Sequence, residues 1–211
     1  MTDKMKAVRL HAFGGPDVLC YEDAPMPMVN AGEVLVKVHA AGINPPDLYL
    51  RDGYRALPPG WQPNATFPLI PGTDISGVVA TLGEGVTVFK PGDEVFAMVN
   101  FPDDLMKGSG AYAEYICVPV AQLAHKPQKL GYLEAAGAPM SLLTAWQFLI
   151  NTGHDAPNPF QSFKHSPVAL EGTTVMINGA AGGVGHLVVQ IAKWNGAYVI
   201  AVASGRTKAF L

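Results

Sequence analysis

The sequence predicts an α/β protein in two parts: a small, mostly antiparallel β-barrel or sandwich, followed by the first unit of a parallel doubly wound sheet. Two observations predict this fold class. As far as Pro127, short apolar segments alternate with turns rich in glycine and proline. From Thr173 onward, an apolar strand, a glycine-rich turn, an amphipathic helix and another apolar strand follow one another, which is the order of a β-α-β unit. We place the two predicted domains at residues 1–130 and 131–211.

The first part is predicted to consist of short strands. Residues Glu33–His39 alternate polar and apolar side chains, as a half-buried strand does. Three further apolar segments predict strands at Ser76–Ala80, Glu94–Val99 and Tyr112–Val118. Turn signals separate the strands, at Gly14–Pro16, Asn44–Asp47, Pro58–Gly60, Pro71–Gly72 and Pro91–Asp93.

The second part begins with a change of composition. Residues Leu133–Ile150 are rich in alanine, leucine and methionine and predict a buried helix that begins near Pro139. Residues Asn151–Leu170 contain three prolines and predict a loop. A strand is predicted at Thr173–Asn178 and another at Ala197–Ala203.

The helix between these two strands is predicted from its apolar face, which consists of Val184, Leu187, Val188, Ile191 and Ala192. Asn195–Gly196 is expected to end this helix. A single β-α-β unit has one face with nothing packed on it. We therefore expect this unit to leave apolar surface exposed.

Composition excludes several classes of function. Charged residues make up 15% of the chain, the net charge is −3 and no run of lysine or arginine occurs, so nucleic acid and membranes are not expected as partners. The two cysteines, Cys20 and Cys117, form no CxxC pattern, which excludes a structural zinc site and favours a reducing compartment. The first six residues lack the apolar stretch of a signal peptide. We expect a soluble, cytoplasmic protein.

The glycine-rich turn predicts a nucleotide-binding loop. Gly179, Gly182 and Gly185 lie three residues apart, where glycine permits a tight turn and lets the backbone approach a diphosphate. The N–H groups and positive dipole of the helix N-terminus favour the phosphates. Tight packing of the helix on the strand is the alternative explanation for the glycines. The predicted cofactor-binding residues here are Gly179, Ala180, Ala181, Gly182, Gly183, Val184 and Gly185.

The residues after the second strand favour NADP(H) over NAD. A site for NAD usually has an acidic residue about 20 residues after the glycines, on the ribose 2′-hydroxyl. The chain has no acidic residue after Glu171, whereas Ser204, Arg206 and Lys208 offer a hydroxyl and two cations to a 2′-phosphate. The alternative is that Arg206 and Lys208 only lie at the solvated start of the next helix.

Six segments between Lys6 and Lys208 carry a family resemblance: Gly32–Val38, Ala41–Asp47, Phe67–Gly72, Gly77–Val79, Pro91–Val95 and Ala180–Gly185. They resemble the medium-chain dehydrogenase/reductase superfamily, which joins a GroES-like catalytic domain to a Rossmann domain. Within it, the chain is similar to the zinc-free quinone oxidoreductases of the ζ-crystallin-like branch. The resemblance implies a GroES-like β-barrel followed by a truncated Rossmann domain. We therefore expect the 211 residues to be part of a longer protein that forms a homodimer.

The resemblance also concerns metal binding. Zinc-dependent members carry cysteine after the Gly-Ile pair and His-Glu after the Pro-Gly pair, whereas this chain has Asn44 and Thr73–Asp74 at those positions. Asparagine and threonine are poor ligands for zinc, which prefers thiolate and imidazole. We therefore expect no catalytic metal.

By the same resemblance, the catalytic residues that line the substrate cleft beside the nicotinamide are Asn44, Asp47, Tyr49 and Tyr54. Asn44 is expected to donate a hydrogen bond, the two tyrosines to stack on or hydrogen-bond the substrate, and Asp47 to fix the loop. Thr144 matches a family position near the nicotinamide. The alternatives are turn chemistry at Asn44 and Asp47, and a helix hydroxyl bonded to a preceding carbonyl at Thr144.

Without a metal, the hydride acceptor must give a reduction product that is itself a stabilised anion, as quinones and conjugated carbonyls do. The residues and the resemblance together predict an NADPH-dependent reductase of quinones or related small enones. Two alternatives stay open. One is an enoyl-thioester or 2-alkenal reductase of the same superfamily, and the other is a non-enzymatic NADPH-binding protein.

Overall fold

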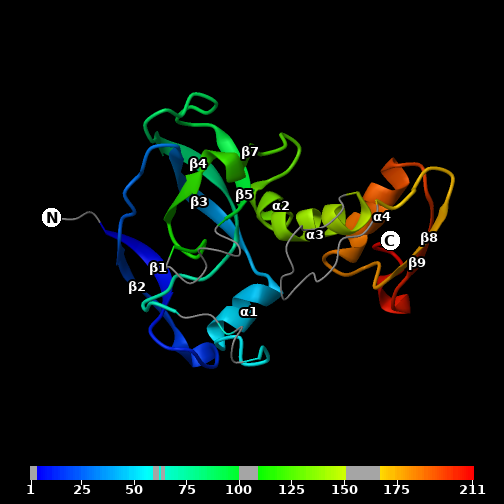
Figure 1. Cartoon of the computed structure of the whole chain (residues 1–211), viewed down its shortest axis with the longest axis horizontal. Coiled ribbons are helices and arrows are strands. Elements are labelled where there is room, and N and C mark those ends of the chain that lie inside the picture. Colours follow the sequence, from blue (N-terminus) through cyan, green and yellow to red (C-terminus); the bar gives the residue numbers. More distant parts are fainter. Residues whose placement is uncertain (1–3, 59–61, 63–64, 100–108, 151–166) are drawn as a thin grey trace. The chain divides into compact units, whose positions relative to one another are not determined.

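The computed structural model describes residues 4–58, 62, 65–99, 109–150 and 167–211 (Figure 1). The chain divides into two compact units, residues 1–139 (unit 1) and 140–211 (unit 2). The boundary predicted from the sequence lies earlier, at 130/131, ahead of the short helix α2 (Tyr132–Ala136). This helix packs on strands of unit 1 and is therefore part of that unit.

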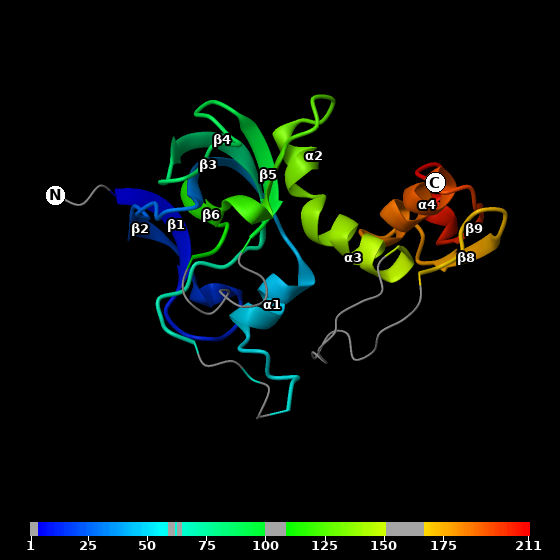
Figure 2. The same ribbon diagram turned by 45° about the horizontal axis from the view of Figure 1, so that its top comes forward.

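Unit 1 is built from antiparallel strands. Strands β1 (Lys4–Leu10) and β2 (Leu19–Pro25) form a two-stranded sheet. A five-stranded antiparallel sheet has the order β6-β3-β4-β5-β7, and Figure 2 shows β3, β4 and β5 curving together around the interior of the unit. Its strands are β3 (Glu33–Gly42), β4 (Asp74–Leu82), β5 (Glu94–Met98), β6 (Tyr115–Pro119) and β7 (Leu123–His125). The antiparallel character predicted for this part is confirmed.

The core of unit 1 lies against the five-stranded sheet and includes the fully buried side chains of Val34, Val36 and Ile75. In β3, Val34, Leu35 and Val36 are all buried, so the alternation predicted for this strand fails at its start. A register shift between Leu35 and Val36 accounts for this, because a β-bulge changes the face on which the following side chains lie.

The turn predicted at Asn44–Asp47 is wrong, because this segment begins a helix, α1 (Pro45–Arg51). Asn44 has an extended backbone and is the N-cap residue, and Pro45 takes the first helical position. Proline suits that position because its N–H would have no partner within the helix and its φ is already near the helical value. The Asn-Pro-Pro-Asp pattern is therefore a helix start here.

The helix predicted to begin near Pro139 is α3 (Pro139–Leu149), so its start is confirmed. The short helix α2, which ends at Ala136, precedes it and was not predicted. Helix α3 buries Ala145 and Leu149, but its side chains Leu143, Trp146 and Phe148 are exposed. The predicted burial therefore holds for one face of this helix only, because its apolar composition did not show which side chains would pack.

Unit 2 contains the predicted β-α-β unit. Strands β8 (Thr174–Asn178) and β9 (Tyr198–Val202) are parallel, and α4 (Gly185–Trp194) connects them. The predicted apolar face of α4 packs on the core of the unit. The helix ends at Asn195, and Gly196 follows with a φ of +83°. These predictions are confirmed. Among the described residues, short 3-10 helices are η1 (Pro16–Val18), η4 (Val120–Gln122) and η5 (Gly205–Thr207).

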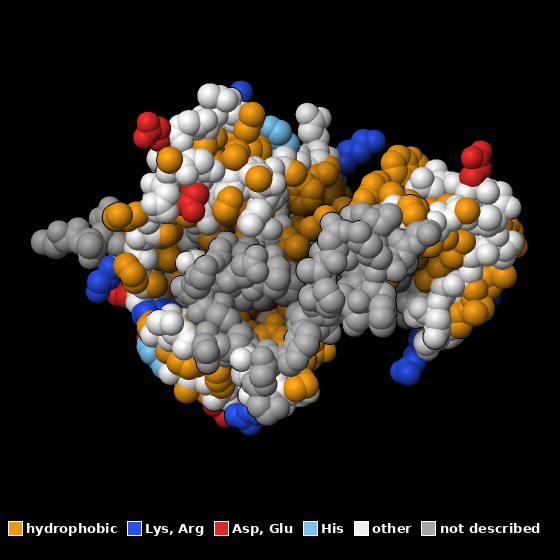
Figure 3. All heavy atoms as spheres, viewed as in Figure 1, with side chains coloured by type: hydrophobic (Ala, Val, Ile, Leu, Met, Phe, Trp, Pro, Cys, Tyr) orange, Lys and Arg blue, Asp and Glu red, His pale blue; other side chains and the backbone are white. Residues whose placement is uncertain are grey.

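One face of the β8–β9 pair is exposed and apolar, as expected for a β-α-β unit with a single layer of helix. Met176, Tyr198, Ile200 and Val202 share this face, and the first two are 70% and 68% exposed. Figure 3 shows hydrophobic side chains gathered where Figure 1 places β8 and β9. The apolar surface comes from alternation along both strands.

A loop was predicted after α3, at Asn151–Leu170. Residues 151–166 of this segment lie outside the described part of the chain. Within the described part, no helix combines the length and the apolar composition that crossing a bilayer requires.

Candidate functional site

The N-terminus of α1 lies beside the segment that leads into β4. The side-chain amide of Asn44 donates a hydrogen bond to Thr73 Oγ1 at 3.3 Å, and both residues are buried. These two residues stand where the resemblance places zinc ligands, and they bind each other. An amide and a hydroxyl do not fit zinc. Within the described residues, no group of three His, Cys, Asp or Glu side chains is placed to hold a metal ion.

Asp47, in the first turn of α1, is a buried acceptor for two donors. Its Oδ2 accepts a hydrogen bond from the Asn44 N–H at 2.7 Å and from the Tyr112 hydroxyl at 3.0 Å. Burial raises the pKa of Asp47, and these two hydrogen bonds, together with the backbone of Gly72, oppose that shift. Asp47 therefore joins the start of α1 to the segment that contains Tyr112.

The sequence analysis did not find Tyr112 or Gly72 as parts of this cluster. The Tyr112 ring lies over Gly72, where an added Cβ would be 2.5 Å from a ring carbon, and Gly72 has a φ of +98°. The turn signal at Pro71–Gly72 was visible in the sequence. Nothing in the spacing indicated that Tyr112 pairs with Asp47, which lies 65 residues earlier.

The two predicted tyrosines have different surroundings. Tyr49, on α1, is 48% exposed, whereas Tyr54 is 7% exposed and packs with Leu10, Leu50 and Leu69. Their ring centroids lie 6.1 Å apart with the planes at 58°. The structure therefore brings the two rings together but leaves only Tyr49 open to a ligand from solvent.

Tyr54 also has an unusual backbone and an altered acidity. Its φ is 52°, which is uncommon for a bulky residue, and its N–H donates to the Tyr49 carbonyl at 2.7 Å. Burial, together with the charges of Asp47 and Asp52, raises the pKa of Tyr54 to about 12. The hydroxyl therefore stays protonated at neutral pH.

In unit 2, the predicted nucleotide loop is a tight turn between β8 and α4. Gly179 has a φ of +69°, and its carbonyl accepts a hydrogen bond from the Gly182 N–H at 2.8 Å. A Cβ at Gly185 would lie 2.1 Å from the Gly179 oxygen, so only glycine fits there. At Gly183 the nearest atom would be Ser141 Oγ at 3.5 Å, an ordinary contact.

The geometry of this loop agrees with both explanations of its glycines. Gly185 serves the close packing of helix on strand. The side chain of the N-cap residue of α4, Val184, makes no cap, so the positive end of the helix dipole is left to favour an anion.

The same turn adjoins the end of β9. Ala180 is fully buried and donates its N–H to the Val202 carbonyl at 3.0 Å, while its neighbour Ala181 is half-buried. Ser204 caps η5, its hydroxyl accepting a hydrogen bond from the Arg206 N–H at 3.4 Å. The side chains of Arg206 and Lys208 are exposed.

Thr144, on α3 of unit 2, forms a hydrogen bond with a preceding backbone carbonyl, which was the alternative to a contact with the cofactor. Its hydroxyl donates to the Met140 carbonyl at 2.7 Å. The hydroxyl oxygen can still accept a hydrogen bond. A contact of Thr144 with a cofactor therefore stays a prediction.

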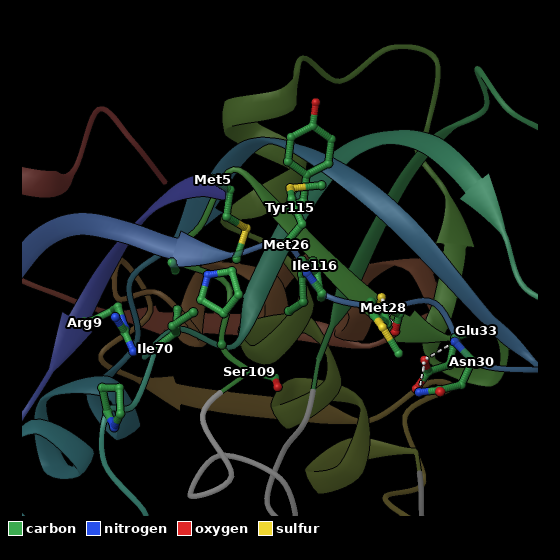
Figure 4. A pocket seen from close by; sticks show the side chains of 16 residues that line it. Met5, Arg9, Met26, Met28, Asn30, Glu33, Ile70, Ser109, Tyr115 and Ile116 are labelled. Carbon is green, nitrogen blue, oxygen red and sulfur yellow. Dashed lines mark hydrogen bonds between the residues drawn. The ribbon is translucent and has the colours of Figure 1, made fainter. Parts of the chain in front are cut away.

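Two cavities of unit 1 are lined by other residues. One, of about 530 Å³, has 16 lining residues, none of them among the predicted site residues; Met5, Met26 and Met28 contribute three thioethers to its wall (Figure 4). The other, of about 440 Å³, is lined mostly by apolar atoms and includes Tyr112 and Ile43. We call Asn44, Asp47, Gly72, Thr73 and Tyr112 the α1 cluster. The second cavity adjoins this cluster, because Ile43 precedes Asn44.

Known proteins resemble nearly the whole chain. The family model of the alcohol dehydrogenase GroES-like domain matches residues 30–128. Human quinone oxidoreductase is 34% identical over 200 residues, which cover 94% of this chain and 53% of the human protein. The quinone oxidoreductase from Coxiella burnetii has a TM-score of 0.75 and 34% identity, covering 99% of this chain and 59% of its own. Mycobacterial Rv1454c, solved in complex with NADPH, has a TM-score of 0.71 and 30% identity, covering 98% and 54%. The chain spans about half the length of the curated relatives it matches.

Proposed function

This chain belongs to the medium-chain dehydrogenase/reductase superfamily, in its ζ-crystallin-like quinone oxidoreductase branch, and from this premise we propose that it is an NADPH-dependent reductase that transfers a hydride to a quinone or a related conjugated carbonyl compound. The hydrogen bond between Asn44 and Thr73 carries the proposal, because this pair occupies the positions at which zinc-dependent members bind their Lewis acid. Such a site suits a substrate that needs no metal. Quinones meet this requirement, since their reduction gives a delocalised hydroquinone anion.

NADPH supplies the hydride when it is bound. In unit 2, the uncapped N-terminus of α4 and the glycine backbone before it favour a diphosphate. The exposed cations Arg206 and Lys208 favour a 2′-phosphate. The NADPH complex of mycobacterial Rv1454c supports this choice of cofactor.

In unit 1, the residues of α1 orient the acceptor. Tyr49 offers an exposed ring on which a planar quinone can stack. The Asn44 amide has a second hydrogen beyond the one donated to Thr73. Because the pKa of Tyr54 is raised to about 12, its hydroxyl is a weaker acid than an ordinary tyrosine. This hydroxyl is also buried, so solvent supplies the single proton that the hydroquinone anion takes up after hydride transfer.

The test of this function is turnover by the 211-residue chain with NADPH. We expect 9,10-phenanthrenequinone to be reduced faster than a crotonyl thioester or a 2-alkenal, and dialysis against a strong chelator to leave this rate unchanged. Faster reduction of the thioester would favour an enoyl reductase. NADPH binding without turnover would favour a non-enzymatic protein, and stoichiometric zinc lost together with activity would contradict the zinc-free site.

The choice of cofactor is tested at Arg206. We expect NADPH to bind at least about tenfold more tightly than NADH, a difference of about 1.4 kcal/mol. Arg206→Ala should remove most of this difference and leave the NADH affinity nearly unchanged, because only the 2′-phosphate distinguishes the two cofactors. Calorimetric titration of both cofactors measures the affinities. Arg55→Ala, in unit 1, is the control, and equal affinities in the parent chain would contradict the assignment.

A further inference from the structure

Tyr112 belongs to the α1 cluster, and the proposed mechanism does not use it. Its hydroxyl donates to Asp47 Oδ2 at 3.0 Å, and its N–H donates to the Pro71 carbonyl at 2.9 Å. Its own carbonyl accepts from the Val8 N–H at 2.8 Å, and its ring lies over Gly72. Tyr112 therefore connects β1, the segment that leads into β4, and the N-terminus of α1.

We propose that Tyr112 is a positioning residue for the substrate site: its hydroxyl holds Asp47, and Asp47 holds the backbone of Asn44 and the first turn of α1. The helix that begins with this turn carries Tyr49, the exposed ring of the site. The proposal rests on the proposed function and extends it to a residue outside α1. Tyr112 acts through Asp47 and need not touch the substrate.

The carboxylate of Asp47 depends on its donors because its surroundings disfavour a charge. The side chain is 5% exposed, and its Oδ1 has no hydrogen-bond partner among the residues that the structure describes. Hydrogen bonds from the Asn44 N–H and the Tyr112 hydroxyl favour the ionised form. Of these two donors only Tyr112 is a side chain, so it can be changed without altering the backbone.

Tyr112 is suited to remain a donor. Burial and the negative charge of Asp47 raise the pKa of Tyr112, so its hydroxyl keeps its proton through the physiological range. Two further titratable groups face the pair, Tyr54 beside Asp47 and Asp74 beside Tyr112. Tyr112→Phe removes the donor and leaves the ring over Gly72, so we expect this variant to fold.

The test compares Tyr112→Phe with a matched control, Tyr132→Phe, in the 211-residue chain. The Tyr132 hydroxyl donates to Glu94 Oε1 at 2.6 Å, so the control loses the same kind of hydrogen bond outside the α1 cluster. In Tyr112→Phe we expect kcat/KM for 9,10-phenanthrenequinone to fall about tenfold, with the KM for NADPH unchanged. The acid limb of the pH profile and the ¹³C titration of the Asp47 carboxyl should both move to higher pH, because the carboxylate has lost a donor. Tyr132→Phe should show none of these changes.

These measurements separate the positioning role from the proposed function. If the parent chain does not reduce the quinone, the proposed function fails. The positioning role of Tyr112 is then tested by the titration of Asp47 and by the affinity of the chain for 9,10-phenanthrenequinone without NADPH. A raised Asp47 pKa with about tenfold weaker binding supports the positioning role. An unchanged Asp47 pKa in Tyr112→Phe overturns it. The positioning role is also overturned if the Asp47 pKa is raised in Tyr112→Phe but turnover of the quinone is unchanged. Where the parent chain shows no turnover, a raised Asp47 pKa with unchanged quinone binding overturns it in the same way.

Discussion

Gly185→Ala is expected to destabilise unit 2 by about 3 kcal/mol and to weaken NADPH binding by more than about 100-fold. The new Cβ would lie 2.1 Å from the Gly179 oxygen and 3.0 Å from the Ala180 Cα, and both are backbone atoms. Relief requires the start of α4 to move away from the end of β8, which opens the turn that would hold the diphosphate. Thermal unfolding measures the loss of stability, and calorimetric titration with NADPH measures the loss of affinity.

Gly183→Ala is the matched control within the same turn. Its Cβ would meet only Ser141 Oγ, at 3.5 Å, and Gly183 does not have a positive φ. Glycine-to-alanine changes at compatible positions stabilise by about 0.4–1 kcal/mol through the unfolded state. Gly183→Ala should therefore melt at the parent temperature or above it. Equal losses of stability in the two variants, or no loss in either, would show that the close approach at Gly185 does not control the turn.

Tyr54→Ala is expected to cost about 3–5 kcal/mol of unfolding free energy, the range for removing a large buried aromatic side chain. The ring is 7% exposed and fills the space between Leu10, Leu50 and Leu69. Tyr49→Ala should cost far less, because its ring is 48% exposed. Urea unfolding of the two variants compares these free energies directly.

The same pair separates stability from catalysis. Tyr49→Ala should lower kcat/KM for the quinone by about 10- to 100-fold, equivalent to about 1.4–2.7 kcal/mol, with the NADPH affinity unchanged. Tyr54→Phe keeps the buried ring and should retain most of the turnover, because the hydroxyl is a poor acid. If Tyr54→Phe abolished turnover, Tyr54 would be a proton donor and the enoyl-reductase function would be favoured. Unchanged quinone kinetics in Tyr49→Ala would remove that ring from the site.

Sequence patterns among residues close along the chain predicted most of the helices and strands correctly. The strand, turn and helix signals of β8, α4 and β9 all lie between residues 174 and 202, and the structure forms the parallel pair that they indicate. The start of α1 was misjudged for a local reason as well. Asn44 followed by Pro45 suits the first turn of a helix as well as a β-turn, since both use an asparagine cap and a proline with φ near −65°.

Residue types and their spacing were thus sufficient to predict an antiparallel first part and a β-α-β second part with a tight glycine turn. These features depend on backbone sterics and on hydrogen bonds between residues close along the chain. Long-range packing decided that Tyr54 is buried while Tyr49 is exposed, and that the Tyr112 hydroxyl reaches Asp47. Such contacts form only when β1, the segment that leads into β4, and α1 come together in the folded unit. The shape and polarity of the space between these elements determine which side chains meet. No local pattern in a single sequence indicates that space.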